Sequence, residues 1–301
     1  MKIATITLFC NESFRLETWK KYYAEYRDGI ALHVIMNNGD PKDTPTLREA
    51  FPDSLILESP SPNMMYSYNL ALREILKDSE IDAIGQIVND IRIEPGGIPL
   101  LWETLYSRED LFAVSPVLLE KDSDKVVCFG CEINRKNYRY IQLDSGKKLD
   151  SLPREIRMVS GLPGGIFLAK RSYYESLGFQ DEAIYMYADE IDMGIRVASQ
   201  GLKMAATSFV LAWHQHQFKE LSAGRHANSM AAFYIGRNAV YLASKYESAL
   251  RVARVFLHHI IAAADIWRSA LFHAKRDGSF AYGAAMIRGA FRGLFYKRSL
   301  G

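Results

Sequence analysis

The sequence has 301 residues, of which 49% are hydrophobic and 24% are charged. This composition is typical of a globular protein with one large core, or a core and an appendage. No apolar stretch approaches the roughly 20 residues that cross a bilayer, which argues against a transmembrane segment. We also expect no secretory signal, because the first apolar run ends at Asn11-Glu12 without a cleavage site.

The formal net charge is +2, and it is unevenly distributed along the chain. The segment from Arg251 to Gly301 contains nine Lys and Arg residues and two acids, so it is basic while the rest of the chain is mildly acidic. A basic tail indicates an anionic partner surface, either lipid headgroups or nucleic acid.

The chain contains 3 cysteines, and Cys128 and Cys131 form a single C-x-x-C with no second pair at zinc spacing. They fall in a strand-like run, in which residues three apart face opposite ways. We therefore interpret them as small buried hydrophobic residues rather than as a redox or metal site, and we expect a reducing compartment.

The first half of the chain alternates between strand and helix patterns. Strands are predicted at 2–9, 30–36, 55–57 and 81–88, and helices at 14–26 and 67–76. The run 81–88 is almost continuously apolar, which is typical of the buried centre of a parallel sheet. This alternation predicts βαβ units in an open α/β sheet whose ligands bind at the carboxyl ends of the strands.

The middle of the chain is more irregular, and its end is helical. We predict strands at 111–118, 126–133, 138–141, 166–169 and 208–211, and a helix at 189–200 that ends at Gly201. From about Ala227 the pattern is almost entirely helical. A boundary near 222–226 would separate a catalytic domain at 1–225 from a C-terminal helical extension at 226–301.

Two polar segments adjoin predicted strands. Asn89-Asp90 follows the strand at 81–88, where a carboxylate must be solvated, paired or bound to a cation. Capping of the next turn is the alternative for Asp90. Gly164-Gly165 precedes the strand at 166–169, where glycines allow a ligand to approach the backbone, and a plain turn is the alternative.

An acidic cluster opens the predicted helix at 189–200. Acids favour a helix N-terminus, and Asp192 and Arg196 are spaced as an i,i+4 ion pair, so helix stability accounts well for Asp192. It accounts less well for Asp189 and Glu190, because adjacent carboxylates repel each other.

Two histidines follow the strand predicted at 208–211. His214 and His216 share one side of an extended segment, so either could meet a metal ion. A hydrogen-bonded histidine with no metal is the alternative.

Taken in this order, these segments resemble the family 2 glycosyltransferases, especially their bacterial rhamnosyltransferase-like branch. The resemblance covers roughly residues 1–245 and depends on an ordered set rather than on one motif. The matching positions are Met36-Asn37-Asn38-Gly39, Asn63, Asn69, Val88-Asn89-Asp90, Glu94-Pro95-Gly96, Gly164-Gly165, Gly178-Phe179-Gln180-Asp181-Glu182, Asp189-Glu190-Ile191-Asp192, Arg196, Gly201, His214 and Gly236-Arg237-Asn238.

The resemblance implies the GT-A fold, an α/β architecture in which an open mixed sheet is flanked by helices, here with a C-terminal helical extension. It also implies an inverting, metal-dependent hexosyltransferase. Such an enzyme moves a sugar from a UDP- or dTDP-linked donor to an acceptor hydroxyl, in bacterial cell-surface polysaccharide assembly. A catalytically weak or inactive sugar- or nucleotide-binding protein on the same fold is the alternative.

The resemblance assigns roles to individual residues. Asp90 and His214 would hold a Mg²⁺ or Mn²⁺ ion that neutralises the diphosphate of the donor. Glu190, with Asp189 beside it, would be the general base that accepts the proton of the acceptor hydroxyl. The implied donor-binding residues are Phe9, Asn37, Asn38, Asn69, Asn89, Gly164 and Gly165.

The sequence departs from the family pattern at three positions. Asn37 stands where many members have an Asp that binds the nucleobase. Asp90 is the only charged member of the usual acidic pair, and Glu190 replaces an Asp as the base. The preference between uracil and thymine therefore stays open.

The basic tail contains an amphipathic helical pattern with flanking arginines. Such a helix suits an anionic membrane interface, whereas packing on the catalytic domain or on a second subunit of a homodimer is the alternative. We expect a cytoplasmic protein, peripheral on the inner face of the membrane, with a glycan or lipid-linked glycan acceptor and no nucleic-acid partner. The apolar positions are Phe280, Ala284, Ile287, Phe291, Leu294 and Phe295.

Two other α/β enzyme classes are excluded. No glycine occurs before Gly29, so the phosphate-binding fingerprint of a dinucleotide oxidoreductase is absent after the first predicted strand. A nucleotidyltransferase would need a loop rich in Gly and Lys or Arg at the same place, and that loop is missing too.

Overall fold

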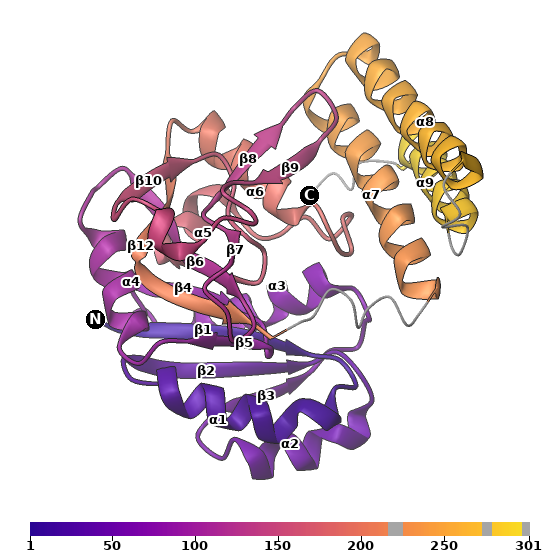
Figure 1. The fold of residues 1–301 in the computed structure, drawn as a ribbon. Helices are drawn as coiled ribbons and strands as arrows, with labels where there is room; N and C mark the ends of the chain where they lie inside the picture. The colour runs from indigo at the N-terminus through magenta and orange to yellow at the C-terminus, as the bar shows by residue number, and fades with distance from the viewer. Residues whose placement is uncertain (216–224, 273–278, 297–301) are drawn as a thin grey trace. The chain divides into compact units, whose positions relative to one another are not determined.

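The computed structural model describes residues 1–215, 225–272 and 279–296 (Figure 1). The chain divides into two compact units. The first comprises 1–132, 142–182 and 193–216, and the second comprises 133–141, 183–192 and 217–301. The second unit thus combines the C-terminal helices with two short internal segments. The boundary between a catalytic domain at 1–225 and an extension at 226–301 stays a prediction.

The first unit is built on one mixed sheet, in the order β10-β12-β6-β11-β4-β1-β2-β3, with β5 paired to β12 and β7 paired to β6. β1, β2, β3 and β4 are parallel, whereas β11 runs antiparallel to both β4 and β6. The strands are β1 (Ile3–Phe9), β2 (Ile30–Asn37), β3 (Leu55–Glu58), β4 (Ala83–Ile87), β5 (Ile91–Ile93), β6 (Leu111–Glu120), β7 (Val126–Cys128), β10 (Ile156–Val159), β11 (Ile166–Lys170) and β12 (Lys203–His214).

Helices cover the sheet of the first unit. α3 packs on β1 and β2, and α4 packs on β6, β11 and β12. The side chain of Asn63 caps α3, because its Oδ1 accepts hydrogen bonds from the backbone N–H groups of Met65 and Tyr66. The helices are α1 (Leu16–Tyr26), α2 (Thr44–Ala50), α3 (Met64–Ile75), α4 (Gly97–Tyr106) and α5 (Arg171–Leu177).

Most of the predicted strands and helices are confirmed, and the helix predicted at 189–200 ends just before Gly201 as expected, with Gly201 at a φ of +71°. Five elements were not predicted: α2, α4, α5, β5 and β10. Four of them have seven residues or fewer and α4 begins at Gly97, so they carry little periodic signal. The helix α4 forms because it packs on the sheet, and β5 and β10 form because they pair with β12.

The run 126–133 forms two strands rather than the one predicted, β7 and β8 (Cys131–Asn134). Gly130 separates them with a φ of +79°, and a Cβ at this position would lie 2.4 Å from Cγ1 of Val159. Only glycine fits both this conformation and this space.

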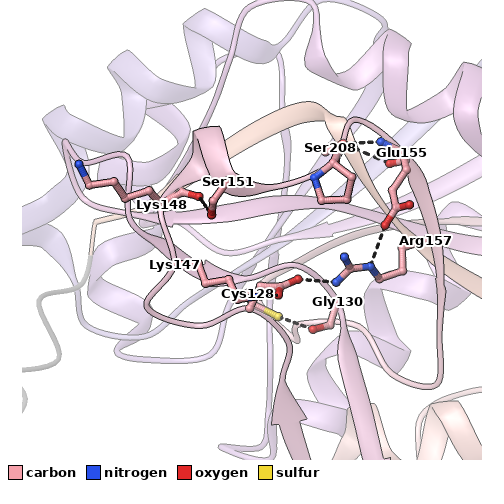
Figure 2. Close-up of polar contacts among 10 residues, drawn as sticks. Cys128, Gly130, Lys147, Lys148, Ser151, Glu155, Arg157 and Ser208 are labelled. Atoms are coloured by element: carbon pink, nitrogen blue, oxygen red, sulfur yellow. Dashed lines mark hydrogen bonds and ion pairs between the residues drawn. The ribbon is translucent and has the colours of Figure 1, made fainter.

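The break at Gly130 changes the placement of the two cysteines. Cys128 and Cys131 are both fully buried, as predicted. The prediction that they face opposite ways is wrong, because their Sγ atoms lie 3.4 Å apart. Figure 2 shows Cys128 directed at the carbonyl of Gly130, to which its Sγ donates at 3.0 Å.

The second unit contains α7 (Arg225–Tyr246), α8 (Ala249–Phe272), α9 (Ser279–Leu294) and the tip of the hairpin formed by β8 and β9 (Arg139–Gln142). α7 packs on both α8 and α9 around a small core of Ala232, Ala263, Ala285 and Met286. The predicted helical character after Ala227 is thereby confirmed. Within residues 1–215, 225–272 and 279–296, no helix is both long and apolar enough to span a bilayer.

Candidate functional site

The carboxyl ends of β4 and β12 bring Asp90 and His214 together in the first unit. Asp90 lies in the turn after β4, and His214 is the last residue of β12. β5 pairs antiparallel with β12 and places Ile91 opposite His214. As a result, Oδ2 of Asp90 lies 3.4 Å from Nε2 of His214.

The carboxylate of Asp90 is buried, with 7% of its side chain exposed, and it is paired with Arg15. Nη1 of Arg15 donates to Oδ2 of Asp90 at 3.0 Å. A buried carboxylate requires such a partner, because desolvation strongly disfavours an isolated charge. Arg15 was not predicted as a site residue. Its position soon after β1, whose carboxyl end lies at the same sheet edge, was the available signal.

A second carboxylate lies at this edge. Nδ2 of Asn89 donates to Oε2 of Glu12 at 2.5 Å, and Asn89 is 5% exposed. Glu12 follows β1 as Asn89 follows β4, and these strands are parallel neighbours. The amide of the predicted site residue Asn89 is therefore fixed by Glu12, an acid that the sequence analysis did not identify as a site residue.

Asp90 and His214 form a ligand pair that fits a divalent cation. Mg²⁺ and ions like it commonly use one or two protein carboxylates and complete their shell with water and substrate phosphates. The neutral imidazole of histidine is the commonest metal ligand in proteins. Across the described parts of the chain, no group of three or more His, Cys, Asp and Glu side chains could hold a metal ion. His216, the alternative ligand, lies outside the described residues.

The two asparagines at the end of β2 have different surroundings. Nδ2 of Asn37 donates to the carbonyl of Asp40 at 2.9 Å and to Oγ1 of Thr44 at 3.1 Å, and its Oδ1 accepts from the N–H of Gly39. Its amide therefore builds the turn after β2.

Asn38 is buried as well, with 8% of its surface exposed. Its Oδ1 has no hydrogen-bond partner among the residues that the structure describes. Its backbone N–H donates to the carbonyl of Phe9 at 2.8 Å, so the ends of β1 and β2 are joined here. A buried acceptor without a donor is costly unless a ligand or water satisfies it.

Gln215 is a further residue that the sequence did not single out. Its backbone N–H donates to the carbonyl of Asp90 at 2.8 Å. Both polar atoms of its side-chain amide are buried, and neither has a hydrogen-bond partner within the described ranges. This amide lies next to His214 in the chain, at the same edge of the sheet.

Gly164 and Gly165 lie beside β4, as the order of the predicted segments suggested. The carbonyl of Gly164 accepts from Nε2 of Gln86, and the carbonyl of Gly165 accepts from the N–H of Val88. A Cβ on Gly165 would lie 3.1 Å from Cδ1 of Ile91. The turn formed by Gly164 and Gly165 is therefore hydrogen-bonded to the carboxyl end of β4, close to Asp90 in the chain.

The amide of Asn69 has a local structural use. Its Nδ2 donates to the carbonyl of Gln180 and to Oε1 of Glu182, and its Oδ1 accepts from the N–H of Gln180. Asn69 thus ties α3 to residues 180–182. The donor-binding role stays a prediction.

A separate cavity of about 350 Å³ lies where β12 departs from its regular pairing with β6 after Thr207. Oγ of Ser208 accepts from the N–H of Glu155, whose carboxylate accepts from Arg157, as Figure 2 shows. None of the predicted site residues lines this cavity, whose lining residues are Glu94, Leu149, Asp150, Leu152, Arg154, Ser208, Phe209 and Leu211.

The predicted acids Asp189 and Glu190 belong to the second unit, where they open α6 (Asp189–Ser199). Burial, with a smaller contribution from the nearby charge of Asp192, raises the pKa of Asp189 to about 6. A hydrogen bond from its own backbone N–H and a hydrogen bond shared with the carboxyl group of Glu190 act against this rise in pKa. Two adjacent carboxyl groups, one of them titrating near neutrality, can accept a proton from an acceptor hydroxyl.

Comparisons with known proteins identify solved structures with a similar fold, but no family of similar sequences. No model of a protein family and no curated protein matches the sequence. Among solved structures, the mannosyltransferase PcManGT from Pyrobaculum calidifontis, solved with GDP-Man and Mn²⁺, is 14% identical with a TM-score of 0.58. That match covers 98% of this chain and 88% of the mannosyltransferase.

GalNAc-T7, solved with UDP, GalNAc and Mn²⁺, is a second similar structure, 8% identical with a TM-score of 0.57. The match covers 72% of this chain and 44% of GalNAc-T7, so the chain corresponds to less than half of that protein. Both similar structures are glycosyltransferases, and both share the mixed sheet with flanking helices described above. The predicted fold is thereby confirmed: this chain has the GT-A fold of nucleotide-sugar glycosyltransferases.

Proposed function

We propose that this protein is a metal-dependent, inverting glycosyltransferase. It moves a hexose from a nucleotide-diphosphate sugar, UDP- or dTDP-linked, to an acceptor hydroxyl. The bacterial rhamnosyltransferase-like branch and the role in cell-surface polysaccharide assembly are proposed from the sequence resemblance alone.

The observation that carries this proposal is the pairing of Asp90 with His214 at the carboxyl ends of β4 and β12, with 3.4 Å between Oδ2 and Nε2. Ligands bind at this edge in open α/β sheets. The structurally similar glycosyltransferases were both solved with Mn²⁺ and with a nucleotide or nucleotide sugar, which supports the same ligand class here.

Asp90 and His214 are the residues that would hold the cation, either Mn²⁺ or Mg²⁺. The cation would supply charge neutralisation of the leaving diphosphate. The protein's own contribution is to hold the carboxylate and the imidazole in place, through β5 and β12, before the cation arrives.

Asn38 is the better candidate of the two asparagines for contact with the nucleobase. Its buried Oδ1 has no donor in the described parts of the chain, whereas the amide of Asn37 is used by the turn. An N–H group of uracil or thymine would satisfy this oxygen.

Glu190 is the proposed general base, with Asp189 beside it. A single in-line displacement at the anomeric carbon inverts its configuration, and the attacking hydroxyl gives up its proton to a positioned carboxylate. Asp189, whose pKa is raised to about 6 by burial, keeps the pair from carrying two full charges below that pH.

We also propose a peripheral membrane location, which suits a lipid-linked acceptor. Leu294 and Phe295 at the end of α9 are 41% and 75% exposed, and the exposed Arg288 and Arg292 precede them. Apolar side chains beside arginines suit a surface of anionic lipid. Flotation of the Leu294→Ser/Phe295→Ser protein on anionic vesicles should fall, while Leu100→Ser, at an exposed leucine of α4, should float like the wild type. Equal flotation of all three proteins would end the membrane proposal.

The transferase proposal is tested with the full chain and a panel of UDP-, dTDP- and GDP-sugars. We expect Mn²⁺ or Mg²⁺ to permit binding of a donor, measured by calorimetry and by a rise in melting temperature, and to permit its slow hydrolysis or transfer. Binding without turnover would favour the inactive sugar- or nucleotide-binding protein instead. If no donor binds, both the transferase and the sugar- or nucleotide-binding protein are excluded.

A matched pair of variants connects the result to the site. Asp90→Asn should weaken Mn²⁺-dependent donor binding at least tenfold, because the amide lacks the charge that holds the cation. Asp122→Asn makes the same chemical change at an exposed turn, where the φ of 48° suits asparagine, and should bind donor normally. Equal binding by the two variants would remove Asp90 from the site.

A further inference from the structure

The segment that leads into the two acids is held in an unfavourable backbone conformation. Tyr185, Tyr187 and Ala188 have φ values of 67°, 59° and 71°, in the left-handed region that L-residues rarely adopt. Asp189 and Glu190 follow directly and begin α6. Such a concentration of strain persists only when surrounding groups determine the conformation.

Two adjacent side chains of α7 hold this segment in its conformation through hydrogen bonds. Nη2 of Arg237 donates to the carbonyls of Ala183, at 2.7 Å, and Ile184. Nδ2 of Asn238 lies within hydrogen-bonding distance of the carbonyls of Ile184, Met186 and Tyr187, at 3.2, 2.8 and 2.7 Å. Together they engage four of the five carbonyls from Ala183 to Tyr187.

Arg237 and Asn238 are themselves buried and fixed. They are 5% and 0% exposed, and Nε of Arg237 donates to Oδ1 of Asn238 at 2.8 Å. The guanidinium of Arg237 also lies over the ring of Tyr234, and that ring stacks on Tyr185 at 5.0 Å. Nη2 of Arg237 and Nδ2 of Asn238 are therefore directed at the backbone of the segment before the two acids.

α9 lies directly against α7 at this point. A Cβ on Gly293 would lie 2.5 Å from the carbonyl oxygen of Arg237, and a Cβ on Gly289 would lie 2.0 Å from that of Phe233. Gly289 and Gly293 are four residues apart and share one face of α9. Such close approach is possible only with glycine, and it limits movement of the α7 backbone that carries Arg237.

The end of α7 holds the first turn of α6. Nζ of Lys245 and the hydroxyl of Tyr246 donate to Oδ1 of Asp192, at 2.8 and 2.6 Å. Asp192 is fully buried, so this carboxylate depends on these donors. The acids at 189 and 190 thus stand between two anchored points, the 183–188 segment and Asp192.

We propose that α7, supported by α9, is a positioning clamp for the catalytic acids, and that Arg237 and Asn238 are its positioning residues. The proposal rests on the assignment of Glu190 as the base. It gives the C-terminal helices a role in catalysis that is independent of any membrane contact. Small displacements of a catalytic group strongly reduce the rate, so the clamp acts through the direction of the Glu190 carboxylate.

The test uses full-length Arg237→Lys and Asn238→Asp. Lysine keeps the charge of Arg237 without its planar set of donors, and aspartate keeps the shape of Asn238 without its N–H groups. We expect kcat to fall at least tenfold, with Mn²⁺-dependent donor binding within about twofold of wild type. Exchange of backbone amide hydrogens in 183–192 should speed up. Arg254→Lys, at an exposed position of α8, is the control and should change none of these.

A role in general stability alone would give a different result, namely loss of donor binding and of melting temperature in parallel with kcat. That pattern, or unchanged kcat with unchanged amide exchange in 183–192, would overturn the clamp. If a variant does not fold, Gly289→Ala replaces it, because the added methyl group pushes α9 from α7 without touching the 183–188 segment. A wild-type protein that transfers no sugar would instead refute the proposed function, and amide exchange would still test the clamp.

Discussion

Nη1 of Arg15 lies 3.0 Å from Oδ2 of Asp90, so an arginine from the segment after β1 neutralises the carboxylate proposed to hold the cation. The same oxygen lies 3.4 Å from His214, and Arg15 is more exposed than Asp90, at 23% against 7%. The guanidinium therefore supplies positive charge to the same carboxylate that would hold the cation.

Arg15→Ala should consequently make the protein more dependent on divalent cations. Without metal, the buried carboxylate loses its ion pair with Arg15, and we expect a loss of about 1–3 kcal/mol in the free energy of unfolding. Added Mn²⁺ should restore most of that stability, so the rise in melting temperature on adding Mn²⁺ should be larger in the variant than in the wild type. Arg27→Ala, which removes an exposed pair with Asp53, is the control. An equal or smaller rise in melting temperature with Mn²⁺ in Arg15→Ala would contradict the idea that Mn²⁺ can replace the positive charge of Arg15.

Glu190→Gln should separate binding from chemistry. Glutamine is nearly isosteric but cannot accept the proton of the acceptor hydroxyl, so the rate should fall by ~10²–10⁴. The affinity for the donor should stay close to that of the wild type, which calorimetry with Mn²⁺ would measure. Glu247→Gln, on the same unit but paired with Arg135 and Tyr138, serves as a control for loss of a carboxylate. Normal turnover by Glu190→Gln would assign the base elsewhere.

Asp189→Asn should stabilise the protein at neutral pH. Burial raises the pKa of Asp189 from 3.8 to about 6, so the unfolded chain releases this proton at lower pH than the folded chain does. Stability therefore falls as the pH rises from about 4 to about 6, and the loss is complete above about 6. The shift in pKa limits the gain from asparagine to about 3 kcal/mol.

The pH dependence of the melting temperature tests whether the pKa of Asp189 is raised. Melting temperatures of wild type and Asp189→Asn should differ most at pH 7–8, and the difference should shrink toward pH 4. Asp192 and Glu190 face the same carboxyl group and are present in both proteins. A difference that is constant from pH 4 to pH 8 would mean that its pKa is not raised.

The three cysteines should differ in reactivity. Cys10 is exposed, whereas Cys128 and Cys131 are fully buried and the pKa of Cys131 is raised by its neighbour Cys128 and by burial. A thiol reagent should therefore modify one cysteine per native chain and three after unfolding in denaturant. Rapid modification of all three in the native protein would place the C-x-x-C at an accessible surface.

Much of the first unit could be predicted because its signals are local. The almost continuous apolar run that became β4, and the alternation of strand and helix before it, follow from burial and periodicity within a few residues. The same signals placed Asn89-Asp90 at the carboxyl end of a central strand and Asp189-Glu190 at the start of a helix. They failed at β5 and α4, which are stabilised by the sheet they pack on.

Only the tertiary structure decided which groups meet. Arg15 and Asp90 are 75 residues apart in the chain, and Arg237 lies 54 residues after Ala183. The tertiary structure also gave Asn37 and Asn38 different surroundings. The amide of Asn37 builds a turn, while Oδ1 of Asn38 has no donor in the described residues. The sequence by itself determined most of the strands and helices and the acids that follow or begin them. The partner of each charge depended on how strands and helices pack, and no periodicity encodes that.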